Sequence, residues 1–162
     1  MRTHIDKNLM EIQELKDFNI TVRIMTDIFK KYGAKVKMDK TEIYSPYDAN
    51  MIVKKNDKIR KYTVEIKERN SNSYDTMPLK VKKYCNIMES TKKDEIPLAI
   101  YLVNDHNYYI YNLRTLDLNK VELKNWTIPK IQFTENQEYE KVPTFFLPIN
   151  LSIYHGTYAN NQ

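Results

Sequence analysis

The chain has 162 residues, of which 41% are hydrophobic and 29% are charged, a balance typical of one globular domain and not of a disordered segment. Lysine and arginine number 26 against 21 aspartates and glutamates, and the resulting net charge of +5 favours an anionic partner. Only two glycines are present, which excludes the glycine-rich phosphate loops of Walker or dinucleotide-binding proteins.

The first predicted element is a long amphipathic helix over residues 6–32, with Gly33 as its stop signal. Its apolar stripe, at alternating steps of three and four residues, consists of Leu15, Phe18, Val22, Met25, Phe29 and Tyr32. Glu14 lies at the edge of this stripe and Glu11 one turn before Leu15. An acid that faces a core must be paired or ligated, whereas an acid near a helix start can also reach solvent.

A short strand over 34–38 and a hairpin of 43–53 with 59–69 follow. The apolar run within 49–53 suits a strand that is covered on both faces. If Asn56 and Asp57 form the two-residue turn, the register puts Asp48 directly opposite Glu65. Lys67 then projects on the same side as Glu65, because side chains alternate along a strand.

These three residues give the hairpin a specific chemistry. Asp48 and Glu65 would supply two carboxylates that can hold a divalent metal, and Lys67 would lie beside them. That combination is the equipment of a metal-dependent phosphodiesterase. The competing interpretation is a solvated charged face, which is common for a Glu-x-Lys tripeptide on a strand.

A second helix is predicted to begin at Asp75 or Thr76, with Pro78 in its first turn and with Leu79, Tyr84, Ile87 and Met88 facing inward. Lys80, Lys82 and Lys83 would form a basic strip on it. Such a strip is usually solvated surface. Because it follows the candidate site directly, Lys80 and Lys83 are predicted as contacts to DNA phosphates.

Residues 96–103 are the most apolar segment and predict a central buried strand, and 108–113 predict a further strand. Beyond Arg114 the pattern weakens. Residues 126–133 and 141–149 contain extended apolar pieces with prolines, which we interpret as edge strands or loops that extend the sheet.

The order of elements is thus a helix, three strands, a helix and a strand, with Asp48 on the second strand and Glu65, Ile66 and Lys67 on the third. This resembles the PD-(D/E)XK nuclease superfamily, which includes many restriction endonucleases and archaeal Holliday-junction resolvases. The resemblance covers about residues 6–113. It implies one α/β domain over 1–162, with a restriction endonuclease-like α-β-β-β-α-β core, a mixed central sheet flanked by helices, and a C-terminal extension over 114–162.

The resemblance also implies roles for single residues. Asp48, Glu65 and the backbone carbonyl of Ile66 would bind Mg²⁺ or Mn²⁺, and Lys67 would orient or deprotonate the attacking water or stabilise the transition state. The further acid that many family members carry on the first helix would be Glu14, with Glu11 as second choice. The sequence departs from the family where Tyr47 separates Pro46 from Asp48, so the literal Pro-Asp pair is absent.

The predicted activity is therefore metal-dependent endonucleolytic hydrolysis of DNA. Two alternatives stay open: a nuclease-like fold that only binds DNA or a protein, and an unrelated α/β protein with a charged hairpin. Cutting both strands of a duplex often takes two active sites, so a homodimer is one expected arrangement. We expect a cytoplasmic protein with no membrane association, because the sequence has no long apolar run, no signal-peptide core and a single cysteine, Cys85.

Overall fold

The computed structural model describes residues 4–70, 75–104, 106–129 and 138–159, and the side chains from residue 9 onward. In chain order the elements are α1 (His4–Lys30), β1 (Lys35–Lys40), β2 (Ala49–Lys55), β3 (Lys58–Arg69), β4 (Thr76–Lys80), α2 (Val81–Ser90), β5 (Glu95–Val103), β6 (Asn107–Asn112), the 3-10 turn η1 (Leu118–Lys120), β7 (Glu122–Pro129), β8 (Tyr139–Pro148), the 3-10 turn η2 (Ile149–Leu151) and β9 (Tyr154–Thr157). None of the helices in these ranges is long and apolar enough to cross a membrane.

The strands form two sheets. The main sheet has the order β1-β2-β3-β5-β6-β9, and a second sheet has the order β4-β8-β7. The β3–β5 pair is parallel and the other pairs of the main sheet are antiparallel, so the sheet is mixed. The predicted α/β class and the α-β-β-β-α-β order are confirmed, with the short strand β4 inserted before α2.

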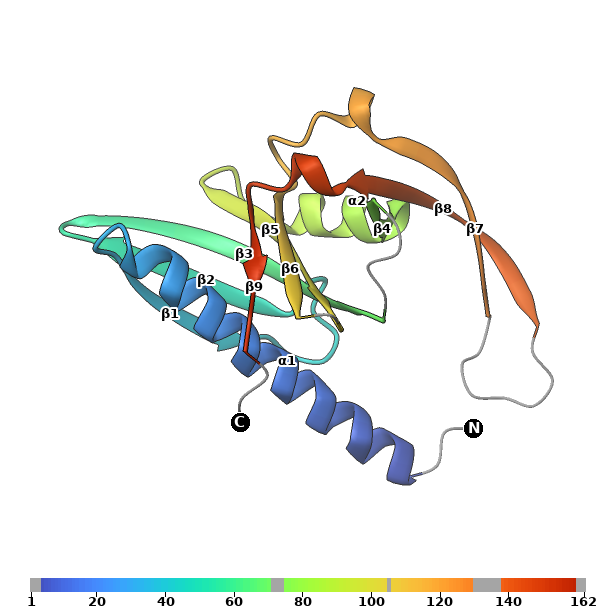
Figure 1. Ribbon diagram of the computed structural model, residues 1–162, viewed down its shortest axis with the longest axis horizontal. Coiled ribbons are helices and arrows are strands. Elements are labelled where there is room, and N and C mark those ends of the chain that lie inside the picture. Colours follow the sequence, from blue (N-terminus) through green and yellow to red (C-terminus); the bar gives the residue numbers. More distant parts are fainter. Residues whose placement is uncertain (1–3, 71–74, 105, 130–137, 160–162) are drawn as a thin grey trace.

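The two faces of the main sheet are covered by different elements (Figure 1). α1 packs on one face through Ile20, Ile24, Met25 and Ile28. On the other face, Ile87 of α2 and residues of the second sheet form a separate cluster. β5 lies between both clusters, since its buried side chains alternate between them, and residues 98–103 are at most 2% exposed. This confirms the predicted central buried strand.

The hairpin has the register that the turn predicted. Lys55 pairs with Lys58 across Asn56 and Asp57, and the ladder runs back to Ala49 opposite Val64. Asn56 has a φ of 55°, a left-handed conformation that asparagine tolerates better than most residues. Two details were wrong. β2 begins at Ala49 and not at residue 43, so Asp48 precedes the strand and its predicted pairing with Glu65 is absent from the ladder. Ile52 is 37% exposed, so the strand is covered on one face only.

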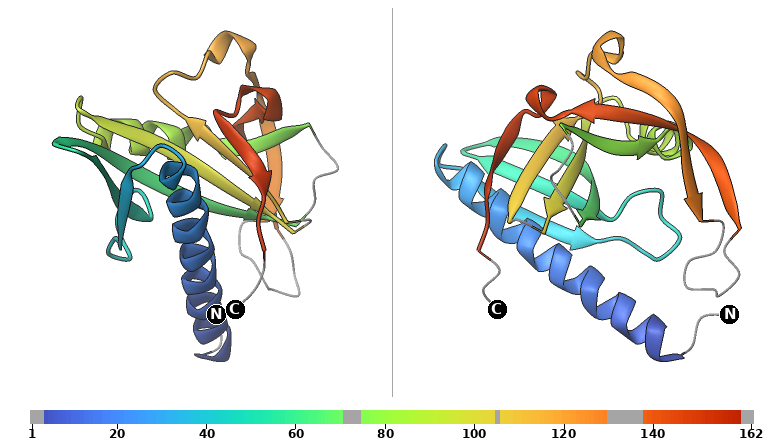
Figure 2. Two further views of the ribbon diagram at one scale, coloured as in Figure 1. Left: turned by 60° about the vertical axis from the view of Figure 1, so that its left-hand side comes forward. Right: turned by 45° about the vertical axis from the view of Figure 1, so that its right-hand side comes forward.

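The predicted stripe of α1 was rotated from the true one. Leu15 and Tyr32 are 52% and 55% exposed, and Phe18, Val22 and Phe29 are only half-buried. The buried stripe is made by Ile20, Thr21, Ile24, Met25 and Ile28. The N-terminal half of α1 extends past the edge of the sheet (Figures 1 and 2), which explains why its apolar positions gain little burial.

The segment after β3 was also predicted incorrectly. Residues 76–80 form β4, paired with β8, and α2 begins only at Val81. Pro78 opposes Phe146 in that ladder and does not lie in a first helical turn. β7 and β8 build this second sheet instead of extending the main one, which gains β9 at its β6 edge (Figure 2). Residues 130–133 of the predicted extended pieces lie outside the described residues.

The central position of β5 gives a test of the fold. Ile100→Ala should destabilise the protein by about 2–5 kcal/mol, because it opens a cavity at a fully buried site. Ile52→Ala, the same change at a partly exposed site on β2, should cost about 1 kcal/mol or less. Urea denaturation measures both, and equal effects would contradict the assignment of β5 to the core.

Candidate functional site

A pocket of about 210 Å³ lies beside β3, just past the last pair of the β2–β3 ladder, Ala49 with Val64. Its lining comes from both helices, from β3, from the end of β1 and from the residue before β2: Glu14, Asp17, Phe18, Lys40, Asp48, Glu65, Ile66, Lys67 and Lys83. We call this the β3 pocket. It brings together Asp48, Glu65, Ile66, Lys67 and Glu14, as the sequence predicted, and it leaves out Glu11 and Lys80.

Asp48 is held in place by three hydrogen bonds. Its backbone N–H donates to the carbonyl of Val64 at 2.9 Å, and its carbonyl accepts from the N–H of Thr41 at 2.9 Å. Its Oδ2 accepts from the N–H of Ile66 at 2.7 Å. The carboxylate therefore takes over the ladder bond that β2 would have made if it continued along β3.

The backbone of Ile66 faces the pocket for the same reason. The N–H and C=O of one residue in a strand point to the same side. Because the N–H of Ile66 reaches Asp48, its carbonyl also points to this open edge of β3, away from β5. The predicted carbonyl ligand is thus directed toward the pocket.

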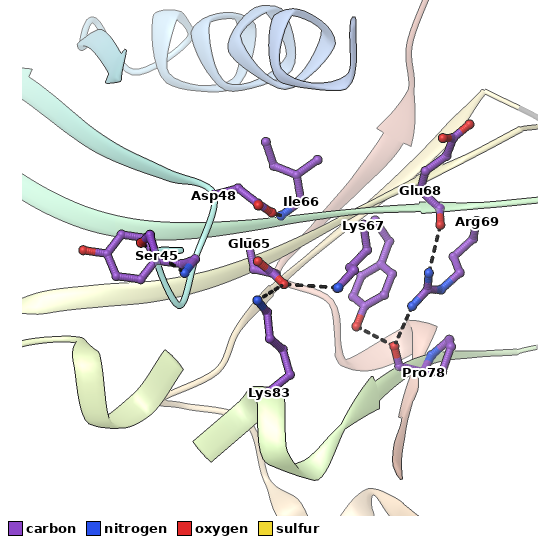
Figure 3. A network of polar contacts seen from close by, with 11 residues as sticks. Ser45, Asp48, Glu65, Ile66, Lys67, Glu68, Arg69, Pro78 and Lys83 are labelled. Atoms are coloured by element: carbon purple, nitrogen blue, oxygen red, sulfur yellow. Dashed lines mark hydrogen bonds and ion pairs between the residues drawn. The ribbon is translucent and has the colours of Figure 1, made fainter. Parts of the chain in front are cut away.

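Glu65 is the most constrained side chain of the β3 pocket (Figure 3). It is 1% exposed. Its Oε2 lies 3.3 Å from Nζ of Lys67 and 3.1 Å from Nζ of Lys83, while its Oε1 is buried without a hydrogen-bond partner. Oε2 is therefore neutralised by two lysines, whereas Oε1 can still accept a hydrogen bond or bind a cation.

The environment of Glu65 changes its acidity. Burial raises the pKa of its carboxyl from 4.5 to about 7, Lys67 and Lys83 oppose that shift, and the neighbouring Asp48 adds to it. Two ionised carboxylates side by side repel each other, so protonation of one relieves the pair. At neutral pH the site would thus bind either a proton or another cation.

Residues of α1 close the pocket from one side. Glu14 is exposed and lies 3.9 Å from Lys40 at the end of β1. Asp17, which the sequence did not single out, is half-buried and accepts a hydrogen bond from Gln13 at 2.9 Å. Burial raises the pKa of Asp17 to about 6. Asp17 precedes Ile20 by three residues on the true buried stripe, so it could be identified only once the orientation of α1 on the sheet was known.

Of the two lysines that the sequence singled out as phosphate contacts, only Lys83, on α2, lines the pocket. Lys83 projects into the β3 pocket and pairs with Glu65, whereas Lys80 is exposed at the end of β4. The predicted role of both as phosphate contacts stays a prediction. For Lys83, its place in the pocket lining puts it next to whatever Glu65 and Asp48 bind.

Arg69 extends this face of β3 and was not anticipated. It follows Lys67 by two residues, donates to the carbonyls of Glu68 and Pro78 at 2.9 and 3.3 Å, and lies 5.7 Å from the ring centre of Tyr101. The hydroxyl of Tyr101 donates to the same Pro78 carbonyl at 2.9 Å. Burial lowers the pKa of Arg69, and these contacts attach β4 to the end of β3.

The described residues contain no group of three or more His, Cys, Asp or Glu side chains arranged to hold a metal. A cation in the β3 pocket would therefore rely on Asp48, Glu65 and the Ile66 carbonyl. These residues fit a hard cation, because all three supply oxygen and Glu65 Oε1 is buried and unpaired. Mg²⁺ keeps several waters and does not need a complete protein cage.

Comparisons with known proteins add an observation on the overall arrangement. No family model and no curated protein matches the chain. Among solved structures it is similar to Hjc, a Holliday junction resolvase from the archaeal hyperthermophile Archaeoglobus fulgidus, with a TM-score of 0.46 and 9% identity over 85% of this chain and 87% of that one. The resemblance drawn from the sequence named archaeal Holliday-junction resolvases, and Hjc is one of them. At this identity and TM-score the similarity carries no functional assignment, which depends on the β3 pocket itself.

The raised pKa of Glu65 predicts how stability depends on pH. In the unfolded chain the carboxyl releases its proton near pH 4.5, whereas the folded protein keeps it to about pH 7. The unfolded state therefore binds fewer protons in this window, and the free energy of unfolding falls as pH rises from about 4.5 to 7. The loss is at most of the order of 3 kcal/mol.

Urea denaturation in EDTA at several pH values measures this. Glu65→Gln should flatten the profile between about pH 4.5 and 7, the range set by the two pKa values. Asp17→Asn should flatten a lower window, from about 3.8 to 6. A Glu65→Gln profile that parallels the wild type would show that Glu65 titrates normally.

Proposed function

We propose that the chain is a metal-dependent nuclease that hydrolyses phosphodiester bonds in DNA at the β3 pocket. The observation that carries the proposal is the state of Glu65. Its carboxylate is fully buried, has one oxygen without a partner, and lies between a second carboxylate and two lysines.

Such a carboxylate is costly for a purely structural role. A buried polar atom without a hydrogen bond costs about 1–3 kcal/mol, and more when it is charged. If the position served stability alone, an apolar residue would suit it better. The buried neighbouring positions are occupied by such residues, Val64 and Leu98. A site that binds a cation accounts for the acid, for its neighbour Asp48 and for the unpaired oxygen together.

In this proposal Asp48, Glu65 and the Ile66 carbonyl hold Mg²⁺ or Mn²⁺. When bound, the ion lowers the pKa of a water and offsets charge on the scissile phosphate. Lys67 orients that water or stabilises the charge of the transition state with its ammonium group. It is one-third exposed and so reaches both Glu65 and a substrate.

The other cations of the pocket suit a phosphodiester backbone. Lys40, Lys67 and Lys83 line it together, and the chain as a whole carries a net charge of +5. From its place beside Glu65, Lys83 would contact a substrate phosphate. Glu14 and Asp17, which line the pocket from α1, would hold a water or an outer contact of the ion.

A second candidate is a nuclease-like module that binds DNA or a protein without cleaving it. Two lysines already neutralise Glu65, and the described residues contain no cluster of three metal-ligating side chains. In that case Lys67 and Lys83 are structural partners of a buried acid. The two candidates differ in whether the pocket binds metal.

Cleavage assays test the first candidate. With Mg²⁺, the wild type should nick supercoiled plasmid, and EDTA should abolish nicking. Asp48→Asn and Lys67→Ala should each lower the rate by about 100-fold or more, because each removes a group that acts on the reacting phosphate or its water.

Two charge-matched controls are exposed and lie outside the pocket lining. Asp94→Asn, in the turn before β5, and Lys54→Ala, on β2, should both cleave like the wild type. If all four variants nick equally, the β3 pocket is not where cleavage occurs.

Calorimetry with Mn²⁺ separates the two candidates. The wild type should bind Mn²⁺ and release a proton, since a pKa of about 7 leaves Glu65 partly protonated at neutral pH. The measured heat should therefore vary with the ionisation enthalpy of the buffer at pH 7, and much less at pH 8.5. Glu65→Gln should bind more weakly and lose the buffer dependence. A wild type that binds no Mn²⁺ would favour the non-cleaving module.

A further inference from the structure

A second cavity, of about 540 Å³, lies at the opposite end of the hairpin from the β3 pocket. It is bounded by α1 and the turn after it, by the tip of the β2–β3 hairpin and by β9. Four aromatic rings line it, those of Phe29, Tyr32, Tyr62 and Tyr154. Three cations line it as well, Lys55, Lys58 and Arg60, and its lining has no acidic residue. We call it the aromatic-cationic cavity.

Three of the rings pack together, and the fourth, Tyr32, is the most exposed of the four. Phe29 contacts Tyr62 and Tyr154, with ring centres 6.0 and 6.5 Å apart. Tyr62 is 5% exposed and forms the floor, whereas Tyr32 is 55% exposed. Tyr32 therefore presents a ring that a flat apolar group can cover without displacing the core.

The cations share one face of the hairpin with these rings. The register pairs Met51 with Tyr62, Val53 with Arg60, and Lys55 with Lys58, so these residues project on the α1 side. Lys55 and Lys58 lie directly opposite each other, and like charges in that position are destabilising. Among the described residues none of the three cations forms an ion pair with a carboxylate. An anion between them would offset the repulsion.

We propose that the aromatic-cationic cavity binds one nucleotide of a single-stranded nucleic acid, with its base stacked on Tyr32 and its backbone phosphates held by Lys55, Lys58 and Arg60. Stacking on aromatic rings next to a cationic track is the general mode by which proteins hold single strands. The volume suits a group of that size. Arg60 lies by the rings and the lysines lie farther out at the hairpin tip, so the cations follow a line and suit successive phosphates of a strand.

The site is distinct from the proposed catalytic one. The two sites lie at opposite ends of β2, which has 7 residues. At the usual rise of a strand, that length corresponds to a separation of about 20 Å. Binding here requires neither a metal nor Asp48, so a failure of the proposed hydrolysis would leave this proposal standing, and the reverse is also true.

Fluorescence anisotropy in EDTA with a labelled twelve-nucleotide oligothymidylate tests the proposal. Tyr32→Ala should weaken binding about tenfold, the loss expected for one stacked base, and Tyr32→Phe should bind like the wild type. An abasic strand of the same length should bind more weakly and should not respond to Tyr32→Ala. Asp94→Asn, which is exposed and lies in neither pocket lining, should bind like the wild type.

The chain offers a matched control for the cations. Lys55→Ala with Lys58→Ala should weaken binding and reduce the slope of log affinity against log salt by about 1.4. Lys35 and Lys54 pair with each other at the same end of the hairpin but project on the opposite face. Removing both makes the same change in charge and should leave binding intact. Melting temperatures of all variants verify that they are folded.

Three results would overturn the proposal. The first is an equal loss of affinity in the Lys35→Ala, Lys54→Ala control, which would mean that charge alone matters. The second is unchanged binding in Tyr32→Ala. The third is competition by thymidine monophosphate as strong as that by the oligonucleotide, which would assign the cavity to a free nucleotide instead of a strand.

Discussion

The site depends on one mismatch of strand lengths. β3 continues to Arg69, but β2 begins only at Ala49, opposite Val64, so the last five residues of β3 have β5 on one side and no strand of the described chain on the other. Glu65 is the first residue beyond the ladder. Its side chain is buried among the elements on the α2 face, while the backbone of Ile66 faces the open edge. A longer β2 would cover that edge with a strand and remove Asp48 from its position. The burial of the Glu65 side chain and the strand-free backbone edge at Ile66 are both consequences of where β2 starts.

The features that could be predicted from the sequence are those that depend on residues close together in the chain. A two-residue turn fixes the register of a hairpin, so the approach of Asp48, Glu65 and Lys67 could be worked out from Asn56 and Asp57 alone. The alternation of faces also held, since Val64 contacts the α1 cluster whereas Glu65 and Lys67 meet on the other side. The strand predicted at 96–103 was recognisable because that run is apolar throughout, as a strand covered on both faces must be.

Long-range packing was the part that the sequence could not supply. Two sets of residues on α1 fit the helical period. The set that is buried contains polar residues, Asp17 and Thr21, and so was not recognised as an apolar stripe. Choosing between them requires knowing which way α1 lies on the sheet. β4 was mistaken for a helix start because Pro78 and the residues before it are typical of a first turn. Its partner β8 is far along the chain, and only that pairing makes it a strand. The contact of Lys83 with Glu65 follows from the later start of α2 and was hidden for the same reason.

α1 and the β2–β3 hairpin connect the two sites that we propose. Glu14 and Asp17 of α1 line the β3 pocket and Phe29 lines the aromatic-cationic cavity, and the hairpin contributes to both in the same way. Both elements are regular and pack on each other through Ile24, Met25, Met51 and Val64, so their ends are held at a fixed separation. The cavity lies on the α1 side of the hairpin, whereas the Glu65 side chain lies on the α2 side with Lys83. The same two elements therefore fix two sites on opposite sides of the sheet, and each can bind its ligand without the other.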